Sequence, residues 1–211
     1  MGITVQLVAV PPSVLEALRR HPSVLDLVFE CSGKLEALRE RAARARSGVA
    51  DRFVLGGVAP AELDGFLADP GLEDAERCTR GEVDLDKTWA GIHFLLTGEP
   101  EPNKGGAATT PLAWALGGSE AALEGTPYQV APRVVGAQPV VLVAGALKRI
   151  DASELRTRFD PHVLERAGVY PDRLWRRADA AVDLFERFAE LVWFYKLAAS
   201  RGQAVLICTT L

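Results

Sequence analysis

The sequence predicts a layered α/β domain, with α+β as the alternative class. Short apolar runs rich in β-branched residues stand at both ends of the chain, and segments with helical spacing lie between them. Proline and glycine mark most of the junctions, and 48% of the 211 residues are hydrophobic, which is enough for a sizeable core. Strands that alternate with helices favour a sheet covered by helices, and the length fits a single domain over residues 1–211.

The N-terminal part begins with a strand and continues as helices. ITVQLVAV (3–10) is apolar and β-branched and ends at Pro11, as expected of a buried strand. A helix should follow up to Pro22, because proline is favoured in a first turn and ends a helix when it comes next. Further helices are expected over about 23–31 and 34–46.

The opening pattern recurs further along the chain. RFVLGGVAPAELDGFLADPGLEDAER (52–77) again reads as a short strand, a proline, a helix and a second proline, and PRVVGAQPVVLVAGALKRI (132–150) is a weaker third copy. Duplication and chance both remain explanations for such a generic unit. The loops are expected at 99–111 and 116–129, where proline, glycine and polar residues gather.

The C-terminal third has recognisable helix boundaries. Asp151 or Ser153 is expected to cap one short helix, and Asp160 followed by Pro161 to begin the next. A long helix is predicted over 177–202 with Gly202 just past its end. QAVLICTTL (203–211) is apolar enough to be a central strand.

The densest group of chemically versatile residues is DLDKTWAGIHFLLTG (84–98). Asp86 occupies the expected cap position of a helix from Lys87 to Thr97, which Gly98 ends. Trp89, His93 and Leu96 share a face of that helix with Ile92, and apolar residues cover most of the remainder. A helix that is apolar nearly all round is expected to be buried.

His93 has two interpretations. It is either a core histidine bonded within the protein, which we favour because buried polar groups need partners, or an acid/base at the floor of a pocket. Lys87 stands unfavourably in the first turn of its helix, so it is a candidate for contact with an anion or an acidic partner. Trp89 could form a wall of the same pocket.

Composition excludes several classes. The net charge is −4 and the sequence pI is about 5.5, so nucleic-acid binding is not expected; the basic run over 34–48 alternates with acids, as on a solvated helix face. No apolar run is long enough to span a membrane, and the N-terminus lacks the features of a signal peptide. We therefore expect a cytoplasmic protein.

Motifs for cofactors, metals and nucleophiles are missing from the sequence. Cys31, Cys78 and Cys208 are widely spaced and odd in number, which argues against disulfides and against zinc. The patterns HExxH, GxSxG, GxxxxGK[ST] and GxGxxG do not occur. We expect neither a cofactor nor a metal site.

Several blocks in order resemble the YfbM-like family of small bacterial proteins, a domain of unknown function. They are the opening strand and helix, DLDKTWAGIHFLLTG, PLAWALGG, DASELRTRFDP, VYPDRLW and FYKLAASRGQAVLI. The resemblance implies a layered α/β fold and one YfbM-like domain, with an inserted segment at about 33–78 that could be a lid or extra packing. It also implies a family-typical set of residues, with pocket or core as the open alternatives: Asp86, Lys87, Trp89, His93, Thr97, Tyr128, Tyr170 and Trp175.

These observations favour a non-enzymatic binding protein, of an immunity or accessory type, that recognises another protein through an acidic surface. The first alternative is a small-molecule enzyme in which His93 is the acid/base and Lys87 or Arg176 holds an anionic group, in a pocket with Trp89 and Tyr170. The second is a structural homodimer, for which VVLVAG (140–145) and the last helix would supply an apolar face.

Overall fold

The computed structural model describes residues 2–30, 35–47, 55, 57–72, 81–102 and 109–211. Four antiparallel strands form one sheet in the order β2-β1-β4-β3. The strands are β1 Thr4–Val10, β2 Gly81–Asp84, β3 Arg133–Val135 and β4 Ala204–Thr210. The predicted layered α/β class is confirmed, and both terminal runs are central strands paired with each other along their whole length.

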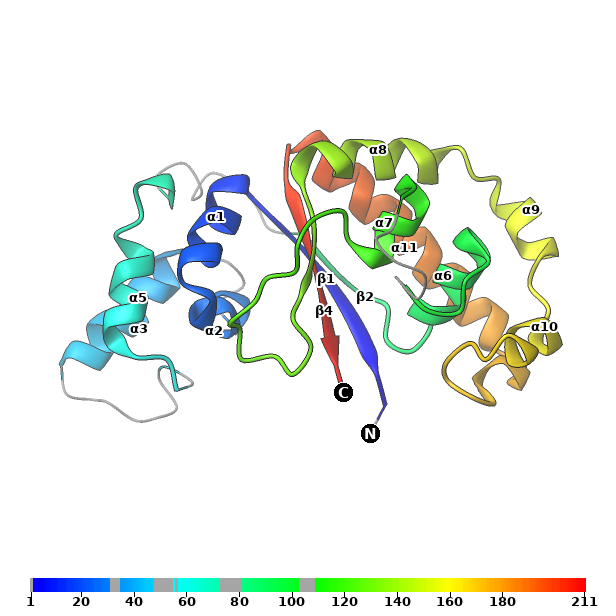
Figure 1. Ribbon diagram of the computed structural model, residues 1–211, viewed down its shortest axis with the longest axis horizontal. Coiled ribbons are helices and arrows are strands. Elements are labelled where there is room, and N and C mark those ends of the chain that lie inside the picture. The colour runs from blue at the N-terminus through cyan, green and yellow to red at the C-terminus, as the bar shows by residue number, and fades with distance from the viewer. Residues whose placement is uncertain (1, 31–34, 48–54, 56, 73–80, 103–108) are drawn as a thin grey trace.

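Helices cover both faces of the sheet and make three layers (Figure 1). One layer contains α1 Pro12–Arg20, η1 Pro22–Val24, α2 Leu25–Glu30, α3 Leu35–Arg46, α5 Pro60–Leu67 and η2 Pro70–Leu72. The other contains α6 Trp89–Thr97, α7 Pro111–Gly117, α8 Ala137–Lys148, α9 Ala152–Thr157, α10 Pro161–Arg166, η4 Leu174–Arg176 and α11 Ala180–Ser200. In Figure 1 the first layer lies to the left of the sheet and the second to the right.

The alternation of side chains along the central strands divides the core in two. Val5, Leu7 and Ala9 of β1 face the layer of α6 and α11, whereas Val8 and Val10 face the layer of α1 and α2. Strand β4 alternates in the same way. Because successive side chains of a strand point to opposite faces, a strand between two helical layers must be apolar on both.

The described residues of the segment at about 33–78 belong to the first layer. Leu38, Leu63, Phe66 and Leu72 are fully or almost fully buried in its core. Within the described residues this segment therefore packs as part of the domain, while its status as an insertion stays a prediction. The short strand predicted at the start of the 52–77 unit falls largely outside the described residues, and Leu55, which is described, is helical.

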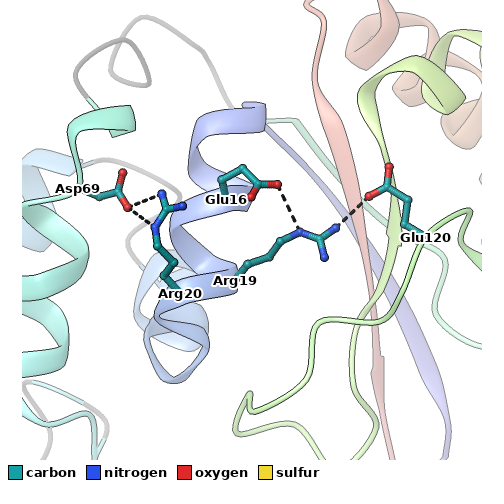
Figure 2. Close-up of polar contacts among 5 residues, drawn as sticks. All are labelled: Glu16, Arg19, Arg20, Asp69 and Glu120. Atoms are coloured by element: carbon teal, nitrogen blue, oxygen red, sulfur yellow. Dashed lines mark hydrogen bonds and ion pairs between the residues drawn. The ribbon is translucent and has the colours of Figure 1, made fainter.

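Two arginines attach α1 to its surroundings in different directions (Figure 2). Arg20 donates to Asp69 Oδ2 at 2.8 Å through Nε, and Gly71 N–H also donates to that carboxylate. These bonds hold the pKa of Asp69 below its usual value. Arg19 contacts Glu16 of its own helix at 3.4 Å and Glu120, in the segment before β3, at 2.9 Å.

Several helix ends follow the predicted chemistry. Asp160 accepts from His162 N–H at 2.8 Å, and Asp151 accepts from Ser153 N–H at 2.8 Å, so both act as side-chain caps. Gly98 and Gly202 adopt φ of 80° and 62° beyond the ends of α6 and α11. Glycine suits these sites because a Cβ is unfavourable in left-handed backbone.

Candidate functional site

The turn before α6 differs from the predicted helix start. Asp86 does not cap α6: its φ is 43°, and its N–H donates to Asp84 Oδ1 at 2.8 Å. Aspartate tolerates this left-handed conformation. Thr88 donates to the Leu85 carbonyl at 2.7 Å, and α6 begins only at Trp89. The predicted cap at Asp86 and helical Lys87 were wrong, because the Asp84 carboxylate closes a tight turn first.

Lys87, Trp89 and Tyr170 do meet, but around the backbone at the start of β1. The Trp89 and Tyr170 rings stack with centroids 6.2 Å apart. The Trp89 indole donates to the Ile3 carbonyl at 3.3 Å, while Ile3 N–H donates to Tyr170 Oη at 2.7 Å. A Cβ built on Gly2 would lie 2.7 Å from Tyr170 Oη and 2.8 Å from Lys87 Cε. These side chains therefore fix the first residues of the chain.

His93 lies inside the layer of α6 and α11, with only 2% of its surface exposed. Burial, assisted by the positive charge of Arg133, lowers the pKa of His93 from 6.5 to about 4. Its Nδ1 has no hydrogen-bond partner in the part of the chain that the structure describes. The imidazole is neutral near pH 7, and protonation at that pH is too unfavourable for an efficient general acid.

The remaining candidates are distributed over the molecule. Trp175 is buried and donates to the Val169 carbonyl at 2.9 Å, and Thr97 donates to the His93 carbonyl at 2.8 Å near the end of α6. Arg176 forms an ion pair with Glu165. Tyr128 packs edge-on against Phe29 in the opposite layer, with ring centroids 6.3 Å apart. The predicted set therefore does not converge on one cleft.

The described residues show neither a metal site nor a membrane-spanning helix. Among them, no three His, Cys, Asp or Glu side chains gather as a metal site would require. Cys208 is buried in β4, and Cys31 and Cys78 lie outside the described residues. No described helix has the length and apolar character needed to cross a bilayer.

An apolar groove of about 690 Å³ lies between α8 and α11. Its apolar lining includes Val141, Ala144, Phe185, Phe188, Ala189 and Val192. The charged residues that line it are Lys148, Arg156 and Lys196, and no acidic residue among the described ones does. The Arg156 guanidinium lies 4.4 Å from the centre of the Phe185 ring. We call this feature the α8–α11 groove.

A second hollow lies on α11 next to this groove, and Ala189 lines both of them. Its volume is about 510 Å³, and Trp193, Glu82, Asp84, Arg187 and Glu190 line it together with apolar residues. Trp193 is 63% exposed, although tryptophan is usually well covered in folded proteins. Sequence reasoning pointed to α8 and the last helix as an apolar face, but it did not single out Trp193.

The whole chain matches known sequences and structures of unknown function. The family model "Domain of unknown function (DUF1877)" matches residues 1–208. The crystal structure of YfbM from Escherichia coli, a protein of unknown function, is similar in fold with a TM-score of 0.54 and 17% identity. That similarity covers 98% of this chain and 99% of the other. No curated protein matches the sequence.

Proposed function

This chain belongs to the DUF1877 family, and we propose that it is a non-enzymatic binding protein whose interaction surface is the exposed face of α8 and α11. The observation that carries the proposal is the α8–α11 groove together with the apolar side chains beside it. Val141 and Leu142 on α8 are 48% and 54% exposed, and Trp193 on α11 is more exposed still. Contiguous apolar patches of this kind mark interaction sites on soluble proteins.

The groove has the chemistry of a recognition surface. Its floor is apolar and basic side chains border it, so an occupant would bury apolar groups and place negative charge at the edge. Interfaces commonly combine an apolar centre with a charged rim that sets specificity. The binding surface proposed here is thus bordered by basic groups, rather than by the acidic ones that the overall charge favoured.

The enzyme alternative receives less support from the geometry. It needs His93 in an open pocket with Lys87, Trp89 and Tyr170, but His93 is enclosed and the other three contact Gly2 and Ile3. Arg176, the other candidate for an anion, already pairs with Glu165. The binding role needs none of these residues to be accessible.

Site-specific photo-cross-linking tests the proposal directly. A benzophenone amino acid would replace Val141 in one variant and Val130 in the other. Val130 is the matched control, because it is also an exposed valine, at 37%, but lies in the segment before β3 rather than on α8. After irradiation in lysate of the natural host, we expect a discrete protein adduct at position 141 and none at 130.

The pattern of adducts at positions 141 and 130 decides whether this face binds another protein. A discrete adduct at position 141 of any mass, including twice the mass of this chain, supports a binding role for this face. Absence of any adduct at 141, or equal adducts at both positions, contradicts it.

A further inference from the structure

We infer that the α8–α11 groove is occupied by Trp193 of a second copy of this chain, in a symmetric dimer in which each copy inserts its own Trp193 into the other. The inference rests on the binding role proposed for this face and names the partner. It follows from two surface features that stand side by side on α11, an exposed tryptophan with acidic neighbours and an apolar groove with basic neighbours.

The first feature is the exposed Trp193 with acidic neighbours. Glu82, Asp84 and Glu190 line the hollow beside it, against one base, Arg187, whose Nη1 lies 2.9 Å from Glu190 Oε2. The hollow that Trp193 lines is therefore acidic on balance. Tryptophan is the residue type most enriched among side chains that dominate binding, because it buries a large area with few rotatable bonds.

The second feature is the groove itself. Its volume of about 690 Å³ is ample for an indole ring and its neighbours, and its lining is mostly aliphatic and aromatic. Lys148, Arg156 and Lys196 are all exposed and supply positive charge around it. A tryptophan flanked by carboxylates is complementary to this site in both polarity and charge.

The placement of the two features fits a symmetric arrangement. Trp193 and Lys196 are three residues apart on α11, and Ala189 lines both the groove and the neighbouring hollow. When two α11 helices cross antiparallel, the same patch on each copy contacts the other, so each Trp193 faces the partner's groove. Such a two-fold interface is self-complementary and is the commonest way in which protein chains associate.

A second copy explains more of the surface than an unrelated partner does. An unrelated protein that filled the groove would leave Trp193 and its acidic surroundings to be covered separately. A second copy covers both features at once and pairs the basic rim of each groove with the acidic patch of the other chain.

The first test is the oligomeric state of the full-length protein, measured by sedimentation velocity and light scattering through the micromolar range. We expect a dimer, and we expect Trp193→Ala to weaken it by about thirtyfold or more, as for a central anchoring residue. Val130→Ala is the control and should leave the dimer unchanged. Circular dichroism and thermal unfolding of each variant verify that the fold is retained.

Charge reversal provides the second test. Lys196→Glu alone and Glu190→Lys alone should each weaken the dimer by about tenfold, because each places like charges together. An equimolar mixture of the two variants should recover a mixed dimer, detected by giving one variant a larger tag. If either variant weakened the dimer only by unfolding, mixing the two variants would not restore a dimer.

The outcomes separate this inference from the proposed function. A wild-type protein that is monomeric at all concentrations, or a dimer indifferent to Trp193→Ala, overturns the inference. Cross-linked adducts at position 141 with a mass other than that of a dimer would then still support a binding face, with a different protein as its occupant. An open-ended series of oligomers overturns the symmetric arrangement.

Discussion

Helices α6 and α11 lie on the same face of the sheet and are both rich in apolar residues, yet their surroundings differ. In α6, Trp89, Ile92, His93 and Leu95 are all buried, so the sheet and neighbouring helices enclose the element. In α11, Phe188, Leu191 and Tyr195 are buried, but Trp193 is exposed and the α8–α11 groove runs along one side. The segment densest in aromatic and titratable residues, which contains α6, is therefore part of the core. The exposed Trp193 lies instead in α11, whose sequence shows no such concentration.

The largest expected loss of stability comes from adding a methyl group at Gly91, where α6 packs closely against Trp175 and Leu184. A Cβ on Gly91 would lie 2.4 Å from Trp175 Cη2 and 2.8 Å from Leu184 Cδ1. Both neighbours are buried, so they cannot move aside cheaply. Gly91→Ala should destabilise the protein by about 3 kcal/mol, at the upper end of overpacking costs, despite its gain in helix propensity. Urea unfolding measures this, and an unchanged midpoint would mean that α6 is not tightly enclosed.

The second effect is the pH dependence that burial of His93 produces. Its pKa is lowered from 6.5 in the unfolded chain to about 4 in the folded protein, so the unfolded chain binds the proton more tightly. Stability from the neutral imidazole is fully present above pH 6.5 and is lost as the pH falls toward 4. The loss should reach about 3 kcal/mol at pH 4.

His93→Gln provides the comparison for this second prediction. The variant should show a flatter dependence of unfolding free energy on pH between 4 and 7, whatever its stability at neutral pH. An NMR titration of wild-type His93 with a midpoint near 6.5 would contradict both the burial of this side chain and the predicted pH dependence of stability. It would also favour the interpretation of His93 as an accessible acid/base.

The fold was more predictable from the sequence than the site, for physical reasons. The strands at 3–10 and 203–211 and the caps at Asp160 and Gly202 are marked by the residue types of their own segments, and all were predicted. The conformation of Asp86 depends on a side-chain bond to Asp84, which residue type alone does not reveal. Trp193 lies on the side of α11 that faces away from the buried Phe188, Leu191 and Tyr195, and the sequence analysis did not single it out.

A smaller effect is expected where aromatic residues hold the first residues of the chain. Tyr170→Phe keeps the ring stacked on Trp89 but removes the oxygen that accepts the Ile3 N–H bond. The loss should be about 1 kcal/mol, the usual net contribution of a hydrogen bond. Hydrogen exchange of the Ile3 amide should accelerate in this variant. Unchanged exchange and unchanged stability would show that the hydroxyl does not fix the chain start.

The smallest expected effect is a gain in stability, and it is expected at the exposed surface beside the α8–α11 groove. Gly145 lies in α8 beside the groove, and the nearest atom to a Cβ built there is Arg149 Nη1 at 3.8 Å, the movable end of a long side chain. Gly145→Ala should therefore stabilise the protein by about 0.5–1 kcal/mol through helix propensity alone. Measured in the same urea series as Gly91→Ala, it is the matched control, since the same methyl group is added to a helix with and without room for it. A loss of stability at Gly145 comparable to that at Gly91 would mean that α8 is as enclosed as α6, and the proposed binding face would lose its physical basis.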